Sequence, residues 1–281
     1  MILRAVNLLC LKKQYRSILV AKESTDEKKR RSRIEYLKMY AVLKGETFHI
    51  ITPAPIHQVS LPVEYNHDIE YSQYSEIIDV LNEYNAQTHI VDKYLRIYQV
   101  IENFMYKTII CELCELKDYE RLTLSDFKAI SDRLQTNEKR ALAGFLEKAL
   151  KVEVAGKSFE ERLKESWNNC FIAPVDNLDK AEVFVQKLGI ISKSGYYFDV
   201  RNIQNKASEI TTLFAKMIYT TRCSIVHNKV NEYHITYTNL NGDIKWVIEN
   251  YLIPNMVDIT YGLMLNQNDV VMFKKDSITL M

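Results

Sequence analysis

The chain has 281 residues, of which 47% are hydrophobic and 26% are charged, and this composition is that of a globular protein rather than a disordered one. Only 7 glycines and 5 prolines occur, so helix breakers are too scarce for a many-turned β fold. The net charge of +1 excludes a uniformly basic nucleic-acid-binding surface, although residues 1–45 carry 12 Lys and Arg against 4 Asp and Glu.

No segment of the sequence predicts export or membrane insertion. Residues 5–11 are apolar, but they are too short and too interrupted by polar groups for a signal peptide. No apolar run approaches the roughly 20 residues that cross a bilayer. The five cysteines are an odd number without the spacing of a disulfide framework. We therefore expect a cytoplasmic protein with reduced thiols and no membrane partner.

Residues 1–85 predict a small mixed α/β region. A helix is expected to begin near residues 24–27, where Ser, Thr and Asp are good N-caps, and to end before Gly45. Short β-like segments follow at 47–51 and 59–63, among three prolines. The helix would carry five basic residues, which either bind RNA phosphates or form a solvated face. These are Lys28, Lys29, Arg30, Arg31 and Arg33.

Residues 86–281 predict a helical bundle. Between residues 90 and 109, apolar residues recur at spacings of three and four, as on one buried helix face. Further helices are expected at 124–134, 138–152, 159–167, 178–188, 202–226 and 244–265, the last interrupted at Pro254. Gly189 is a plausible helix-terminating residue. The whole chain is thus expected to be mainly α, with this bundle behind the mixed region.

Several familiar kinds of site receive little support. Cys111 and Cys114 have metal-like spacing, but no second ligand pair follows and they lie within a helical pattern. His234 falls in a probable loop, where it could assist with substrate. Gly-rich phosphate loops, nucleophile elbows and paired-carboxylate nuclease motifs are absent from the sequence. We expect neither a metal nor a cofactor.

Arg222 and His227 stand at the end of the predicted helix 202–226. On a helical projection, Arg222 lies beside the core face, aligned with the small residues Thr211 and Ala215, where another helix could approach closely. His227 falls about 140° from Arg222 on an ideal helix. A helix terminated by Asn228 would free the histidine to turn towards the arginine. Alternatively, two copies of the chain could pair antiparallel and supply histidines across the interface.

The two side chains suit RNA cleavage without metal. An imidazole titrates near neutral pH and can relay the proton of a 2′-hydroxyl. A fixed guanidinium can hold the scissile phosphate and stabilise charge in the transition state. The expected product is a 2′,3′-cyclic phosphate end. The spacing alone favours a structural pair, in which the arginine lies at the helix end and the histidine caps it.

The run MIYTTRCSIVHNK at residues 217–229 resembles the helix that defines HEPN domains, most closely those of ApeA-type anti-phage proteins. The family places Arg-x4–6-His at the end of a long helix in an all-α bundle that usually dimerises through that helix. Many members are metal-independent endoribonucleases of bacterial toxin or defence systems. The resemblance implies that Arg222 and His227 are catalytic and that the chain forms a homodimer.

Two positions depart from the family pattern. Active members often have Asn, Asp or His after the arginine, whereas this chain has Cys223, whose thiol hydrogen-bonds weakly. Members silenced by adenylylation carry a tyrosine two places after the histidine, where Lys229 stands here. Control by tyrosine adenylylation is therefore not expected, and Lys229 is a candidate RNA contact.

The family often adds an acidic residue from an early helix. Glu102 projects to the apolar side of the helix that begins near residue 90, and a half-buried carboxylate needs a partner. Arg222 is one candidate partner; solvent or a tyrosine hydroxyl is the alternative. Glu102, Cys223 and Asn228 are therefore predicted to support the pair.

The sequence thus predicts a metal-independent endoribonuclease that acts as a toxin or phage-defence effector. Its expected partners are substrate RNA, a second copy of the chain, and an antitoxin or trigger protein. The alternative is a non-catalytic HEPN-type module that binds RNA or protein.

Overall fold

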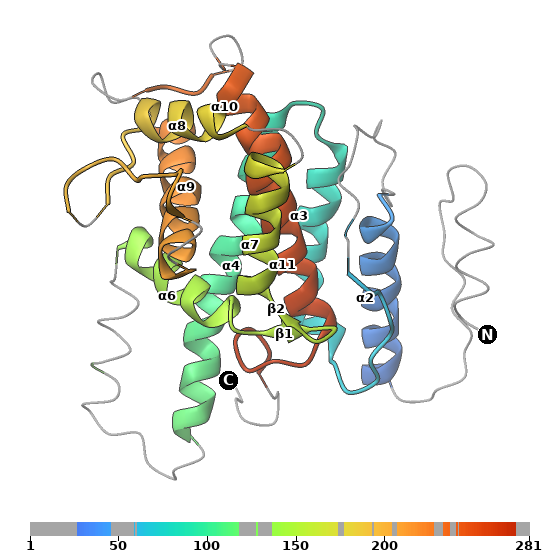
Figure 1. Ribbon diagram of the computed structural model, residues 1–281. Helices are drawn as coiled ribbons and strands as arrows, with labels where there is room; N and C mark the ends of the chain where they lie inside the picture. Colours follow the sequence, from blue (N-terminus) through green and yellow to red (C-terminus); the bar gives the residue numbers. More distant parts are fainter. Residues whose placement is uncertain are drawn as a thin grey trace.

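The computed structural model describes residues 27–45, 59, 61–117, 128, 137–173, 177–192, 194–203, 207–227, 233–236, 240 and 242–273; of residues 27, 28, 113–117, 207 and 208 it describes the backbone alone. The fold is mainly α, as predicted, with one two-stranded sheet in the described part (Figure 1). The expected helix at 124–134 and the expected strand at 47–51 fall outside the described residues, apart from Lys128.

The described elements follow one another in this order. They are α2 (Glu27–Leu43), η1 (Tyr71–Tyr74), α3 (Ser75–Ala86), α4 (Ile90–Lys117), α6 (Glu138–Ala149), β1 (Glu153–Val154), β2 (Lys157–Ser158), α7 (Phe159–Trp167), η2 (Asn168–Ile172), α8 (Leu178–Lys187), α9 (Ala207–Val226), α10 (Gly242–Val247), η4 (Ile248–Leu252) and α11 (Ile253–Leu265). Both η2 and η4 are turns of π-helix.

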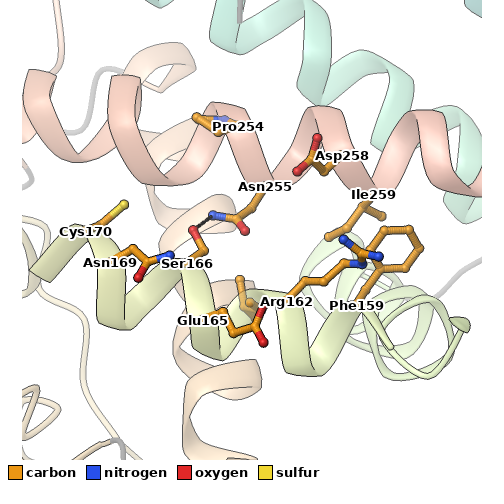
Figure 2. Close-up of a pocket in the computed structure, with 11 residues that line it drawn as sticks. Phe159, Arg162, Glu165, Ser166, Asn169, Cys170, Pro254, Asn255, Asp258 and Ile259 are labelled. Atoms are coloured by element: carbon orange, nitrogen blue, oxygen red, sulfur yellow. Dashed lines mark hydrogen bonds between the residues drawn. The ribbon is translucent and has the colours of Figure 1, made fainter. Parts of the chain in front are cut away.

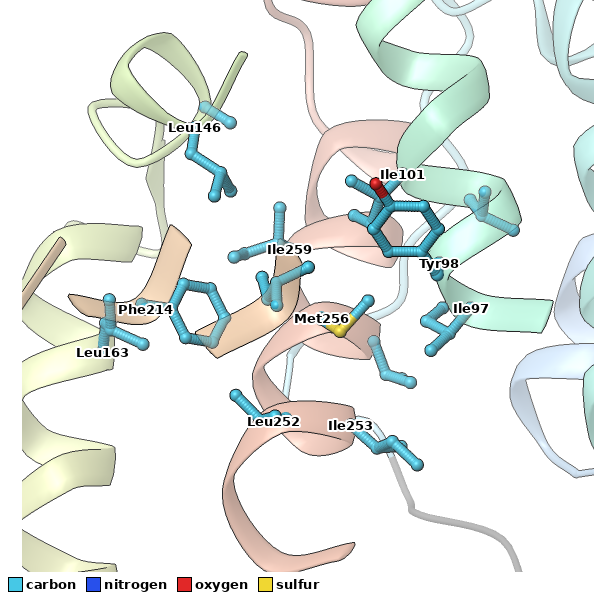
Figure 3. Packing of buried hydrophobic residues seen from close by; sticks show 14 of the residues in the cluster. Ile97, Tyr98, Ile101, Leu146, Leu163, Phe214, Leu252, Ile253, Met256 and Ile259 are labelled. Atoms are coloured by element: carbon cyan, nitrogen blue, oxygen red, sulfur yellow. The ribbon is translucent and has the colours of Figure 1, made fainter. Parts of the chain in front are cut away.

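Helices α4 and α11 lie at the centre of the bundle and are packed against each other. Figure 3 shows Ile97, Tyr98 and Ile101 of α4 close to Met256 and Ile259 of α11. Side chains of α6, α7 and α9 join the same core from the other side. Helix α11 is buried around nearly its whole circumference, which explains its almost wholly apolar sequence. In the described part of the chain, no helix is long and apolar enough to cross a membrane.

The N-terminal helices belong to this core. Helix α2 packs against η1 and α3, and α3 packs against α4. The Ser32 hydroxyl accepts from the backbone N–H of Tyr71 and donates to the carbonyl of Ile69, while the Asn85 amide donates to the carbonyl of Val42. Residues 61–70 form neither helix nor strand. The predicted boundary at residue 86 thus coincides with the end of α3, but the hydrophobic core continues across it.

The ends of α6 and α8 are followed by local turns. Helix α6 ends at Ala149, earlier than the predicted Val152, and the chain then forms the β1–β2 hairpin, whose turn residues Ala155 and Gly156 adopt positive φ. Gly189 follows α8 with φ of +63°, as its predicted role as a helix terminator requires.

A π turn replaces the interruption that was predicted at Pro254. The proline lies in the first turn of α11 and, having no N–H, leaves the carbonyl of Asn250 without a helical donor. The Cys170 thiol approaches that carbonyl, with Sγ 3.3 Å from the oxygen. The wide turn η4 thereby lets α10 continue into α11 without a break.

Candidate functional site

Helix α9 carries the predicted pair and is fixed by the bundle. Its buried side chains include Ile210, Phe214, Met217 and Ile218, and α9 packs against α6, α4 and α7. The Tyr94 hydroxyl of α4 donates to the carbonyl of Ile218 at 2.6 Å. This bond ties α9 to α4 about one turn before Arg222.

Arg222 and His227 are in direct contact. Helix α9 ends at Val226, and the backbone N–H of His227 still donates to the carbonyl of Cys223 at 2.8 Å. The imidazole Nε2 lies 2.8 Å from Nη1 of Arg222. Because a guanidinium can only donate, Nε2 accepts and carries no proton in this arrangement. The histidine thus turns towards the arginine of its own chain, the first of the two predicted geometries.

Glu138 is the carboxylate bonded to Arg222 among the described residues. Its Oε1 lies 3.0 Å from Nε of Arg222 and also accepts the hydroxyl of Tyr98 at 2.5 Å. Arg222 is one-fifth exposed and Glu138 one-quarter exposed, so solvent screens this ion pair only in part. Helix α6 supplies Glu138 from its first turn, directly after the N-cap Asn137. Helix α6 thus orients the guanidinium of Arg222, while α9 positions His227.

The sequence did not single out Glu138. An acidic residue in the first turn of a helix is ordinary, because it interacts favourably with the helix dipole. Its role depends on the start of α6 meeting the end of α9, and no local pattern encodes that meeting. The N-cap Asn137 was the one local signal that fixed where α6 begins.

Tyr98 closes the site on the α4 side. The Arg222 guanidinium carbon lies 5.9 Å from the centre of the Tyr98 ring. Burial, and then the hydrogen bond to Glu138, raise the pKa of the Tyr98 hydroxyl, so it remains a donor. Together Tyr98, Glu138, Arg222 and His227 form a continuous polar chain from the core to the surface.

Glu102 lies near this chain but does not take the place expected for it. Burial and the neighbouring Glu138 raise the pKa of the Glu102 carboxyl, while Arg222 acts in the opposite direction. Glu102 therefore lies in electrostatic range of the pair, while Glu138 makes the direct bond to Arg222. The hydroxyl of Tyr98, on the same helix as Glu102, also bonds Glu138.

Cys223 has its described contact with a neighbour on its own helix, α9. A hydrogen bond with the Cys223 side chain, followed by burial, raises the pKa of Tyr219 to about 12. The thiol is thus engaged one turn back along α9, and its described partner is a tyrosine rather than Arg222 or His227. Asn228 and Lys229, which follow His227, lie outside the described residues.

The basic residues near the N-terminus do not adjoin the pair. Lys29, Arg30 and Arg31 are exposed on α2, and Arg33 is partly buried there. Figure 1 places α2 at the opposite side of the bundle from α9. The side chain of Lys28 lies outside the description. These residues could meet RNA only at a surface separate from Arg222 and His227.

His234 and the next residue, Ile235, both contact the backbone of α9. Its Nδ1 lies 3.2 Å from the carbonyl oxygen of Ser224, and the N–H of Ile235 donates to the same oxygen at 2.9 Å. Ser224 is about 200° from Arg222 around an ideal helix. His234 therefore lies on another side of α9 from Arg222.

A pocket of about 260 Å³ opens elsewhere, between α7 with η2 and the start of α11 (Figure 2). Its wall mixes apolar groups with Arg162, Asp258 and Asn255, whose amide donates to the Ser166 hydroxyl at 2.8 Å. None of the predicted site residues lines it. The candidate pair is thus a surface site at a helix end and not part of this pocket.

Within the described ranges, no group of three or more His, Cys, Asp or Glu residues is placed to hold a metal ion. Comparisons of the chain with protein-family models, with curated proteins and with solved structures find no match. Any account of the function therefore starts from the side chains around Arg222.

Proposed function

We propose that this chain is a metal-independent endoribonuclease of the HEPN type, with Arg222 and His227 as its catalytic residues. One observation carries the proposal: the guanidinium and the imidazole touch at 2.8 Å at the end of a helix, and Glu138 orients the guanidinium from behind. A donor that binds phosphate beside an unprotonated imidazole nitrogen is what 2′-hydroxyl attack requires.

The chemistry follows from these two groups. A phosphodiester oxygen takes the Nη donor of Arg222 and releases Nε2 of His227 from that contact. Nε2 accepts the proton of the 2′-hydroxyl as the 2′-oxygen forms its bond to phosphorus. The bond from phosphorus to the 5′-oxygen breaks, and that oxygen takes a proton from solvent. The products are a 2′,3′-cyclic phosphate and a 5′-hydroxyl.

The oligomeric state and the biological role belong to the same proposal. The resemblance of residues 217–229 to HEPN domains supports a homodimer formed through α9, and a role as a cytoplasmic toxin or phage-defence effector. Val226, at the end of α9, is 49% exposed, as a residue at such an interface would be in the isolated chain. RNA would be the substrate, and an antitoxin or trigger protein the regulator.

A second candidate is a non-catalytic module that binds RNA or protein. The specific observation in its favour is that Arg222 already has three neighbours in the chain: Glu138, Tyr98 and His227. An arginine with these three contacts can have a purely structural role, stabilising the end of the helix. The engagement of Cys223 with Tyr219 points in the same direction.

The test is cleavage of RNA in the presence of a chelator. The purified full-length chain is incubated with single-stranded and structured RNA, alongside His227→Ala and Arg222→Ala. We expect cleavage by the wild type and a loss of roughly 100-fold or more in each variant, with cyclic phosphate ends on the products. Growth arrest on expression is scored in parallel.

Matched controls separate catalysis from general damage. His67→Ala removes an exposed imidazole far along the chain, and Arg201→Ala removes an exposed, ion-paired guanidinium. Both should cleave like the wild type. Equal cleavage by all variants, or no chelator-resistant cleavage together with no growth arrest, would eliminate the nuclease and leave the binding module.

A further inference from the structure

The connection between α8 and α9 contains a small, ordered turn. Ile191 and Tyr197 form an antiparallel bridge, and the N–H of Ser192 donates to the carbonyl of Tyr196 at 2.7 Å. Gly195 allows the reversal with φ of +85°. The turn projects from the bundle beside α9 (Figure 1). The described residues on the two sides of the turn are thus paired with each other through their backbones.

This turn, described at residues 191, 192 and 194–197 and called the 191–197 turn below, displays aromatic rings to solvent. Tyr196 is 78% exposed and Tyr197 is 53% exposed, while Ile191 beside them is 48% exposed. With Val226, they are four of the five large exposed hydrophobic residues in the described part of the chain. Exposed apolar groups that gather in one place indicate a binding surface.

The turn is fastened to the helix that carries the candidate pair. Lys216 of α9 donates from Nζ to the carbonyl of Ile191 at 2.5 Å, and the same Nζ lies 5.1 Å from the centre of the Phe198 ring. Lys216, Tyr219, Cys223 and His227 follow one another at spacings of three and four, so they share the outer face of α9. Along the axis, Lys216 and Arg222 are separated by about 9 Å.

We propose that Tyr196 and Tyr197 form a stacking platform for unpaired bases of the RNA that reaches Arg222 and His227; this rests on the proposed function. A tyrosine ring offers a flat face on which any base can stack. Bases within a duplex are already stacked and cannot reach the rings. The platform would therefore select single-stranded RNA over double-stranded RNA, without strong sequence preference.

Two features favour RNA over a second copy of the chain as the occupant. The rings stand on a projecting turn, whereas a stable protein interface buries a broad surface of about 800 Å² on each partner. The outer face of α9 also leads from the turn to the imidazole of His227 and, through its contact, to the guanidinium of Arg222; these groups bind a phosphodiester and not an apolar surface.

The test measures binding separately from cleavage. All proteins carry His227→Ala, and their affinities for a fluorescent single-stranded RNA and for its duplex are measured by anisotropy. The change is Tyr196→Ala with Tyr197→Ala. We expect single-strand binding to weaken about fivefold or more, with duplex binding unchanged. The matched pair Tyr196→Phe with Tyr197→Phe keeps the rings and should bind within about twofold of the parent.

A further control, Tyr106→Ala, removes a tyrosine of α4 that is 56% exposed and lies outside the turn, and it should leave binding unchanged. The platform is overturned by an unchanged affinity in the double alanine variant, by an equal loss in the double phenylalanine variant, or by no single-strand binding at all. It is also overturned if the alanine variant changes only the oligomeric state in light scattering, which would make the turn an interface between copies.

The two proposals fail in different ways. Tyrosine-dependent binding without cleavage by the wild type would retain the platform and eliminate the nuclease. Cleavage that depends on His227 but is indifferent to the tyrosines would retain the nuclease and eliminate the platform. Thermal melting of each variant shows whether the fold is intact in every case.

Discussion

Arg222 is held at three sides by side chains from three parts of the chain. Glu138 comes from α6, Tyr98 from α4, and His227 from the residue after α9. A partly buried guanidinium needs such partners, because an unpaired charge away from water is costly. Each partner also fixes a different atom of the guanidinium, so its plane has little freedom to rotate. The same contacts that stabilise the helix end would orient the group for phosphate binding.

Because Arg222 and Glu138 form an ion pair, substituting one should change how much substituting the other lowers the free energy of unfolding. A double-mutant cycle with Arg222→Ala and Glu138→Ala is expected to give a coupling of about 1 kcal/mol, measured by urea unfolding. Lys151 and Glu147 form the control pair, since they are 3.7 Å apart and 70% and 75% exposed. Their coupling should stay below about 0.5 kcal/mol. Equal couplings in the two cycles would show that burial adds nothing at Arg222.

At the scale of elements, the start of α6 decides where Glu138 lies. The side chain of Asn137 accepts from the N–H of Arg140 at 3.0 Å and so caps the helix. Glu138 is the next residue, and its position depends on where the first turn begins. Helix α7 has a comparable start, in which Ser158 and Glu161 form a capping box. Neither Ser158 nor Glu161 bonds to Arg222, so this helix start offers a comparison.

Removing either cap should cost similar stability but have different functional effects. Asn137→Ala and Ser158→Ala should each lower the free energy of unfolding by about 1 kcal/mol. If the proposed nuclease is correct, Asn137→Ala alone should slow RNA cleavage, by roughly 10-fold, because a small displacement of a positioned group is costly. Denaturant unfolding and cleavage rates measure the two effects. A comparable loss of cleavage in Ser158→Ala would mean that stability, not the position of Glu138, controls the rate.

At the scale of the whole molecule, α7 and α11 approach closely at one glycine. A Cβ atom on Gly262 would lie 2.1 Å from Cζ of Phe159 and 3.1 Å from Cδ1 of Leu61. Both neighbours are buried, so the surrounding side chains leave little room for a shift. The glycine thus lets the buried helix α11 lie against α7 and against the segment before η1 at the same time.

Substitutions of two glycines should have opposite signs. Gly262→Ala should destabilise the fold by about 1–3 kcal/mol, because the added methyl group meets Phe159 in a packed core. Gly144→Ala should stabilise it by up to about 1 kcal/mol, since nothing lies within 4 Å of the added Cβ and alanine favours a helix. Thermal or urea unfolding of both variants gives the comparison. A neutral Gly262→Ala would mean that Phe159 can move aside without loss.

The sequence by itself determined the helical class and most of the helices from α6 onward. The predicted bounds of α7 and the end of α9 are confirmed, and so is the role of Gly189. These features are local: apolar spacing, caps and glycines act within one or two turns of a helix. The same local pattern placed Arg222 and His227 at a helix end, where a contact between them was possible.

Only the tertiary structure decided which groups surround Arg222. Glu138 and Tyr98 contact Arg222 because α6, α4 and α9 pack together. Glu102 lies in electrostatic range of Arg222 but does not bond to it, although the apolar pattern of its helix had made it the predicted partner. The continuity of α2 and α3 with the core and the attachment of the turn at 191–197 to Lys216 were decided in the same way. Contacts between residues distant in sequence depend on how whole helix faces fit together, and no periodicity within one helix encodes that fit.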